Sequence, residues 1–212
     1  MTDEQALIRA AQQGDLDAFN RLVLAYQDAV YNTAYRILGD AASAEDATQE
    51  AFIRAWQHLR DYRGGSWRGW LFRIVTNACY DQLRRRRRRP TVPLEPTDAE
   101  GEAVESPDWL ADPDPTRNPE AEAERAALRR ALETCLQSLP PEQRAALVLI
   151  DVQNFAYAEA ATALGIALGT LKSRLARGRL RMQDCLRHFP ELLGALTRLN
   201  SGDSTDDSRA SF

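Results

Sequence analysis

The sequence predicts an all-α protein: two small helical domains joined by an extended acidic linker, with a helix-turn-helix in the second domain. Three observations predict this fold class. Apolar residues recur at helical spacing on both sides of the linker, and alternating β-branched runs are almost absent. Seven of the ten prolines lie within residues 90–119. A short helix, a glycine turn and a long basic helix follow one another near the C-terminus, which is the order of a helix-turn-helix.

The distribution of charge sets the domain boundaries. The 212 residues carry 27 basic and 31 acidic side chains, a net charge of −4. Residues 91–124 hold eleven of the acidic and one of the basic side chains, whereas the stretches on either side are net basic. Prolines and like charges keep such a stretch extended. We therefore expect a first domain at 1–89, a linker at 90–119, a second domain at 120–187, and a partly disordered C-terminal extension at 188–212.

Several functional classes are excluded by what the sequence lacks. It contains no nucleophile elbow, glycine-rich phosphate loop or HExxH motif, so we expect no enzymatic activity and no cofactor. Cys79, Cys135 and Cys185 are odd in number and lack the spacing of a zinc site, so no metal is expected and a reducing compartment is favoured. With neither a membrane-spanning stretch nor a signal peptide, a cytoplasmic protein without membrane insertion is predicted.

Four helices are predicted in the first domain. A short helix ends at Gly14, and a longer one follows and ends at Gly39. Ser43 and Asp46 have the spacing of a capping box for a third helix that runs to about Leu59. The turn at residues 63–66 separates it from a fourth helix, which carries apolar residues from Trp70 to Leu83 on one side.

The second domain is predicted to begin with a helix over residues 120–138. Pro140 and Pro141 then mark the start of a new helix, because a proline in the first helical turn loses no hydrogen bond. A helix over 142–152 follows, then one over 157–164, a turn at Gly165 and a last long helix from about Gly169.

The last helix combines an apolar stripe with a polar face. Its stripe is Leu171, Leu175, Gly178 and Met182. Pointing away from that stripe are Lys172, Ser173, Ala176 and Arg177. Lysine, arginine and serine can bond to base edges or phosphates in a major groove, and alanine can touch a thymine methyl group. The alternative is a basic face that is merely solvated.

The fourth helix of the first domain carries a second candidate surface. Arg73, Asn77, Tyr80 and Arg84 share one face, and six consecutive arginines begin at Arg84. Upstream, Tyr62, Arg63 and Trp67 bracket a glycine turn. Aromatic rings that stack on bases, arginines that follow phosphates and an amide that bonds to a base edge suit single-stranded DNA. The alternatives are a core position for Trp67 and a nonspecific polyanion-binding arginine run.

A third surface lies on the helix that follows Ser43. Its polar face carries Asp46, Gln49, Glu50 and an embedded apolar residue, Ile53. An apolar side chain within an acidic stripe indicates a protein interface.

Four segments in register give this chain a family resemblance. They are Asp46-Ala47-Thr48-Gln49-Glu50-Ala51-Phe52, then Trp70-Leu71-Phe72-Arg73-Ile74 with Asn77 and Asp81, then Tyr157-Ala158-Glu159, and finally Gly169-Thr170-Leu171-Lys172-Ser173-Arg174-Leu175. Over about residues 5–187 the chain resembles the extracytoplasmic-function sigma factors, the compact two-domain branch of the bacterial sigma-70 family.

The resemblance implies two partners, core RNA polymerase and promoter DNA, and a role for each surface. Asp46, Gln49, Glu50 and Ile53 would bind core polymerase. Asn77 would hold a flipped base of the melted minus-ten element, with residues 62–67 as the pocket wall. Lys172, Ser173, Ala176 and Arg177 would contact the duplex minus-thirty-five element, with Thr170 and Arg174 near phosphates. Whether an anti-sigma factor also binds is left open.

Two other functions compete with this interpretation. A stand-alone helix-turn-helix regulator would explain the second domain but would leave the two surfaces of the first domain unused. A helical interaction protein with solvated basic faces would show no sequence-selective DNA binding.

Overall fold

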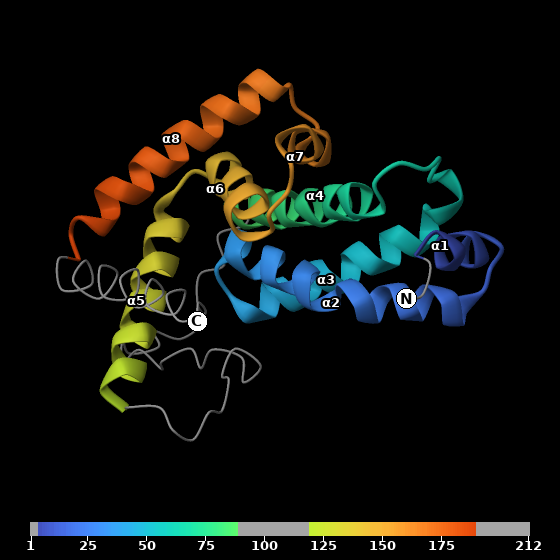
Figure 1. Cartoon of the computed structure of the whole chain (residues 1–212), viewed down its shortest axis with the longest axis horizontal. Helices are drawn as coiled ribbons and strands as arrows, with labels where there is room; N and C mark the ends of the chain where they lie inside the picture. The colour runs from blue at the N-terminus through green and yellow to red at the C-terminus, as the bar shows by residue number, and fades with distance from the viewer. Residues whose placement is uncertain (1–3, 89–118, 190–212) are drawn as a thin grey trace, which may run out of the picture.

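The computed structural model describes residues 4–88 and 119–189, in which every regular element is helical. A first lobe contains α1 (Glu4–Gln12), α2 (Leu16–Leu38), α3 (Ala41–Gln57), the 3-10 helix η1 (Leu59–Asp61) and α4 (Trp67–Arg88). A second lobe contains α5 (Pro119–Ser138), α6 (Pro141–Leu147), the π-helical turn η3 (Val148–Val152), α7 (Tyr157–Leu164) and α8 (Leu168–Leu186). The predicted all-α fold with two helical units is confirmed (Figure 1).

Some of the sequence predictions fall outside this description. The linker expected at 90–119 lies almost entirely outside the described residues, as does most of the extension expected at 188–212. Among the helices that the structure describes, none is long and apolar enough to cross a membrane.

The helices of the first lobe begin and end at capping residues. Asp15 caps α2 by accepting a hydrogen bond from the backbone N–H of Ala18 at 3.0 Å. Gly39 ends α2 with a φ of 87°, a conformation that glycine adopts without strain. The capping box predicted at Ser43 is wrong, because Asp40 is the N-cap of α3 and accepts from the Ser43 N–H at 2.9 Å. Ser43 therefore lies in the first turn and not before it.

The second lobe differs from its prediction in one helix. The helix start expected at Pro140-Pro141 is present, since Pro140 is the N-cap of α6 and Pro141 its first residue. Gly165 ends α7 with a φ of 65°. The helix expected over 142–152, however, is α-helical only to Leu147 and then widens into η3, where the Gln153 N–H bonds to the Val148 carbonyl at 2.9 Å. A π-turn shifts the phase of the following side chains. Val152 is left 40% exposed beside the buried Ile150.

The two lobes share one hydrophobic core. α7 packs on α4, while α5, α6 and η3 pack on α2 (Figure 1). The rings of Phe72 on α4 and Phe155 before α7 lie 5.0 Å apart, and the Arg68 guanidinium stands 4.2 Å above the Phe155 ring. This packing was not predicted, because apolar periodicity shows that a helix face is buried but not which helix covers it.

Polar contacts join the lobes along both sides of this core. Ser66 hydrogen-bonds to Glu159, and Arg68 donates to the backbone carbonyl of Gln153. On the other side, Gln137 Nε2 donates to the Arg36 carbonyl at 3.0 Å, near the end of α2. The described arrangement is therefore a closed one, in which side chains of each lobe satisfy polar groups of the other.

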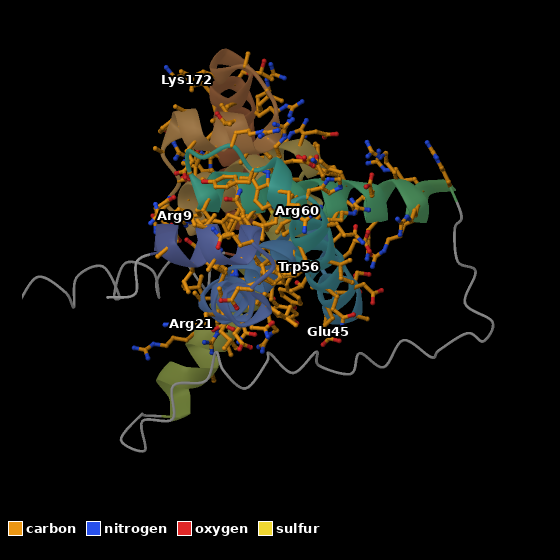
Figure 2. All side chains as sticks on the ribbon, turned by 90° about the vertical axis from the view of Figure 1, so that its right-hand side faces the viewer. Arg9, Arg21, Glu45, Trp56, Arg60 and Lys172 are labelled. Carbon is orange, nitrogen blue, oxygen red and sulfur yellow. A yellow bond between two sulfur atoms is a disulfide. The ribbon has the colours of Figure 1, made fainter. Side chains whose placement is uncertain are left out.

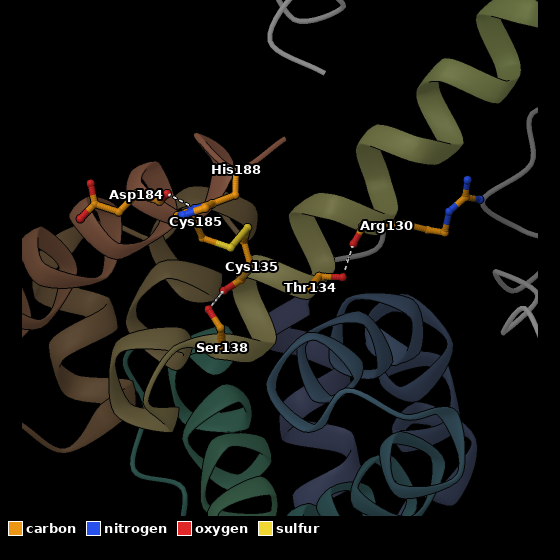
Figure 3. The surroundings of a disulfide bond; sticks show 7 residues. All are labelled: Arg130, Thr134, Cys135, Ser138, Asp184, Cys185 and His188. Carbon is orange, nitrogen blue, oxygen red and sulfur yellow. Dashed lines mark hydrogen bonds between the residues drawn. A yellow bond between two sulfur atoms is a disulfide. The ribbon is translucent and has the colours of Figure 1, made fainter. Parts of the chain in front are cut away.

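A disulfide joins the two long helices of the second lobe. Cys135 on α5 and Cys185 on α8 are bonded, with their Cα atoms 5.6 Å apart, whereas Cys79 is a buried free thiol (Figure 3). From the sequence, three widely spaced cysteines favour a reducing compartment and predict no disulfide. The pair was missed because 50 residues separate its members along the chain and only the packing of α5 on α8 brings them together.

Candidate functional site

The polar face of α3 forms one coherent surface. Asp46, Gln49, Glu50 and Ile53, which we call the α3 face, all line a depression of about 260 Å³ between α3 and α4. Ile53 is 53% exposed, so the apolar side chain predicted at the centre of an interface is accessible. Arg85 of α4 lines the same depression. In the sequence Arg85 is one member of the arginine run that begins at Arg84, and nothing there assigns it to the α3 face.

A chain of ion pairs, two of whose members, Glu50 and Arg54, line this depression, joins α3 to α4. The Nε atom of Arg54 donates to Glu50 at 2.7 Å, and its Nη1 atom donates to Asp81 on α4 at 3.2 Å. Arg84 also bonds to Asp81, and these two arginines lower the pKa of the Asp81 carboxyl below its usual range. The network holds α3 and α4 in register, so the α3 face is presented by a rigid pair of helices.

The polar face of α4 is only partly available. Arg73, Asn77 and Arg84, which we call the α4 face, are exposed. Tyr80 was predicted on the same face but is mostly buried under the second lobe, and its hydroxyl has no hydrogen-bond partner among the described residues. Burial raises the pKa of Tyr80 to about 12. In the closed arrangement, Tyr80 cannot reach DNA.

Trp67 belongs to the core and not to a stacking surface. Its side chain is 2% exposed and packs edge-on against Tyr62, with the ring centroids 5.5 Å apart, and against Trp70 at 5.0 Å. The Tyr62 hydroxyl donates to the Gly65 carbonyl at 2.7 Å, which closes the glycine turn over the rings. The proposed role of Trp67 in stacking on DNA is wrong for this structure, because no base can reach a buried indole. Trp67 therefore occupies a core position, which was the alternative interpretation of the sequence.

A hollow of about 500 Å³ lies beside the glycine turn and is lined in part by α1, a helix to which the sequence assigns no functional role. Tyr62 and Arg63 line it together with Gln5, Arg9 and Gln12 of α1. Gln12 Nε2 donates to the carbonyls of Leu59 and Tyr62 at 3.1 and 2.9 Å and so ties α1 to the turn. Arg63 is exposed at the edge of this hollow. No sequence signal could have found α1 here, since only tertiary packing places it.

The long helix α8 carries the predicted division into a buried and an exposed face. Leu171, Leu175 and Gly178 are buried, and a Cβ atom at Gly178 would meet Leu147 Cδ1 at 2.9 Å, so glycine permits the close approach of α6. The opposite side, which we call the α8 face, exposes Thr170, Lys172, Ala176 and Arg177. Figure 2 shows Lys172 projecting from the end of the molecule opposite Glu45 of α3.

Three further polar residues of α8 are less available to bind DNA, because they are half-buried or already bonded to other groups. Ser173 is half-buried and donates to the Thr170 carbonyl at 2.9 Å. Arg174 is also half-buried and contributes a positive charge near Tyr80. Arg179 bonds to both carboxylate oxygens of Asp151, at 2.5 and 3.1 Å. The cations best placed to meet DNA are therefore Lys172 and Arg177.

Family models match both lobes. The model described as Sigma-70 region 2 matches residues 22–89, and the model described as Sigma-70, region 4 matches residues 129–182. Together they cover more than half of the chain and exclude the linker.

Curated relatives align with most of the chain. The chain is 40% identical to the ECF RNA polymerase sigma factor SigE of Mycolicibacterium smegmatis, over 84% of this chain and 66% of that protein. It is 34% identical to the RNA polymerase sigma-H factor of Pseudomonas aeruginosa, over 87% of this chain and 94% of that protein. Identity to the ECF RNA polymerase sigma-E factor of Escherichia coli is 35%, over 83% and 90% of the two chains.

Two solved structures resemble the fold. The sigma factor RpoE of Bartonella quintana, solved with the anti-sigma factor NepR, matches with a TM-score of 0.58 and 27% identity over 80% of this chain and 96% of that chain. CnrH, solved with the cytosolic domain of CnrY, matches with a TM-score of 0.63 and 24% identity over 87% and 97% of the two chains, which supports the fold alone.

Proposed function

Because this chain belongs to the extracytoplasmic-function branch of the sigma-70 family, whose members direct core RNA polymerase to promoter DNA, we propose that its two lobes divide that task. The first lobe, within 1–89, binds core polymerase and opens the minus-ten element. The second lobe, within 120–187, contacts the duplex minus-thirty-five element. The chain works in the cytoplasm without catalytic activity of its own. The observation that carries the proposal is three separate accessible faces, on α3, α4 and α8.

The α3 face is the proposed polymerase contact. Its four residues surround one depression, and an exposed isoleucine within a polar rim is the usual composition of an interface centre. The Arg54 network keeps this face rigid, which lowers the entropy lost on docking.

The α4 face is the proposed contact with melted DNA, in a form revised by the structure. Asn77 supplies the amide for a base edge, and Arg73 supplies charge for phosphates. Arg84 adds its charge when it exchanges Asp81 for a phosphate. Trp67 is left out, and Arg63 contributes from the rim of the hollow beside α1. Tyr80 takes part only once the second lobe has moved away from α4, so polymerase or promoter binding opens the closed arrangement.

The α8 face is the proposed contact with duplex DNA. A helix with Lys172, Ala176 and Arg177 exposed on one side and leucines buried on the other fits a major groove. Thr170 and Arg174 approach phosphates, and Ser173 reaches a base edge when its hydroxyl turns away from the Thr170 carbonyl. An anti-sigma partner is proposed because a similar sigma factor, RpoE of Bartonella quintana, was solved with one.

Run-off transcription with purified core polymerase on a genomic fragment library tests this function. We expect transcripts from a small set of fragments that share two spaced elements, and none when either this chain or core polymerase is omitted. A stand-alone regulator would instead select fragments without polymerase. If core polymerase with this chain starts no more transcripts than core polymerase alone, the sigma-factor function is contradicted.

A further inference from the structure

The hollow between α1 and the glycine turn, which we call the α1 hollow, is lined by cations. It lies at the end of the first lobe that faces the viewer in Figure 2, where Arg9 and Arg60 are labelled. Arg9 of α1, Arg60 of η1 and Arg63 of the glycine turn all line it. Among the described residues that line the hollow, none is acidic. Because like charges that share a hollow repel one another, an anion bound there would be stabilised.

The carboxylates nearest in sequence do not neutralise this hollow. Asp61, which follows Arg60, is hydrogen-bonded to His58 at 3.3 Å. Glu4, at the start of α1, accepts a hydrogen bond from the Tyr26 hydroxyl. Neither carboxylate lines the α1 hollow. Guanidinium groups therefore dominate the charge around its opening.

The shape of the α1 hollow suits a nucleotide. Gln5, Ile8, Arg9 and Gln12 have the spacing i, i+3, i+4 and i+7, so one face of α1 forms a wall. Ile8 and Tyr62 are buried and contribute an apolar inner surface, whereas Arg9 is exposed. The volume of about 500 Å³ lies within the usual range of about 300 to 1,000 Å³ for ligand pockets. A cationic rim around an apolar surface fits the phosphate and the base of one nucleotide.

We propose that the α1 hollow binds a nucleotide of the melted strand through its phosphate, next to the stretch held by the α4 face. This inference rests on the proposed function and adds Arg9 and Arg60 to the contacts with melted DNA. The glycine turn leads from the hollow directly into α4, and the helical rise from Trp67 to Asn77 is about 15 Å. At about 3.4 Å between successive phosphates, this distance corresponds to about four nucleotides, or fewer in a stretched strand. One short strand can therefore reach both places.

The α1 hollow is open even in the closed arrangement of the lobes. Every residue that lines it belongs to the first lobe, in contrast to Tyr80, which is mostly buried under the second. The free full chain, without polymerase, is therefore a suitable sample for a binding experiment.

The test measures the affinity of the full chain for a fluorescent oligothymidylate of about 12 nucleotides over a range of salt concentrations. Each phosphate contact with a single strand contributes about 0.7 to the slope of log affinity against log salt concentration. In Arg9→Gln/Arg60→Gln the slope should therefore become shallower by about 1.4. Both side chains are exposed, so the fold should be unaffected. Arg9→Lys/Arg60→Lys, which keeps both charges, should keep the wild-type slope.

A matched control separates a local contact from the effect of net charge. Arg21→Gln/Arg130→Gln removes the same charge from exposed positions outside the α1 hollow and outside the three proposed faces. This control should keep the wild-type slope. An unchanged slope in Arg9→Gln/Arg60→Gln overturns the proposal, and so does an equal change in the control. The absence of any strand binding by the wild-type chain overturns it as well.

Two further measurements identify what has failed. Titration with thymidine 5′-triphosphate tests a free nucleotide as the other source of a phosphate. If Arg9→Gln/Arg60→Gln loses affinity for this nucleotide but not for the strand, the hollow belongs to a free nucleotide and the proposal is overturned. Run-off transcription by the wild-type chain with core polymerase tests the proposed function separately. Normal transcription beside an unchanged slope removes only the α1 hollow, whereas no transcription contradicts the sigma-factor function and the inference that rests on it.

Discussion

Arg144 of α6 donates from Nη1 to the backbone carbonyl of Ile37 at 2.6 Å and so joins the second lobe to the end of α2. The guanidinium is buried and also bonds to the backbone carbonyl of Leu139 at 3.0 Å and to Gln137. The last carbonyls of a helix lack partners within it and carry partial negative charge. A buried cation at this point satisfies them and holds the lobes closed.

Replacing Arg144 should therefore loosen the closed arrangement. Arg144→Met keeps most of the side-chain volume but leaves buried carbonyls without donors, so we expect the free energy of unfolding to fall by about 2 to 4 kcal/mol. The radius of gyration from small-angle X-ray scattering should rise as the lobes part. Arg177→Met, at an exposed position, is the matched control and should change neither quantity. An unaltered denaturation midpoint and radius in Arg144→Met would refute the role of this contact.

Tyr80→Phe should have the opposite effect on closure. The buried hydroxyl has no partner among the described residues, so its removal should stabilise the closed form by about 1 kcal/mol. Burial raises the pKa of Tyr80 to about 12, above the value of about 10 for an exposed phenol. The closed form should thus keep its full stability below pH 10 and lose the contribution of Tyr80 as the pH rises towards 12. The difference in unfolding free energy between wild type and Tyr80→Phe should grow in this window, and a constant difference would contradict burial.

The α3 face should decide the affinity for core polymerase. A Gln49→Ala/Glu50→Ala double variant should weaken binding by about tenfold or more, as expected when residues near an interface centre are truncated. Affinity is measured by titration of labelled protein with core polymerase. Arg177→Ala, which lies on the other lobe, serves as control and should bind normally. Wild-type affinity in the double variant would remove this face from the interface.

The α8 face should set the choice of upstream sequence. Loss of a base contact by Arg177→Ala should cost about 1 to 3 kcal/mol and relax preference at one position of the site. Arg179→Ala tests the structural distinction between the two arginines, because Arg179 is bonded to Asp151 and should affect sequence preference much less. Selection from a randomised promoter library measures both. Equal profiles for wild type and Arg177→Ala would exclude this helix as the reader.

The α4 face should act in strand opening. Asn77→Ala should reduce permanganate reactivity at the downstream element while core binding and folding stay intact, because the side chain is exposed. Trp67→Ala should instead destabilise the first lobe by about 3 to 5 kcal/mol, as expected for a large aromatic residue removed from a core. A stably folded Trp67→Ala protein with a specific defect in opening would restore the stacking role that its burial argues against.

The sequence by itself determined the helical fold, the order of the helices and the inward and outward faces of α3 and α8. Helical periodicity is a local property, so Leu171 and Leu175 identified one face and Lys172 and Arg177 the other without any knowledge of neighbours. Turn chemistry likewise predicted the helix ends at Gly39 and Gly165, because only certain residues adopt a left-handed conformation without strain.

Only the tertiary structure decided which of the polar and aromatic residues are accessible. Tyr80 and Trp67 satisfy the sequence pattern of a DNA-binding face. The second lobe, however, brings Glu142 and Arg174 close to a mostly buried Tyr80, and Trp67 is buried beside the glycine turn. The Cys135–Cys185 bond and the Arg144 contact with α2 join positions far apart in the chain. The same is true of Leu132 of α5 and Met182 of α8, which line one apolar groove. Such contacts leave no periodic trace in the sequence, because burial by another helix depends on the packing of whole faces and not on the spacing of residues within one helix.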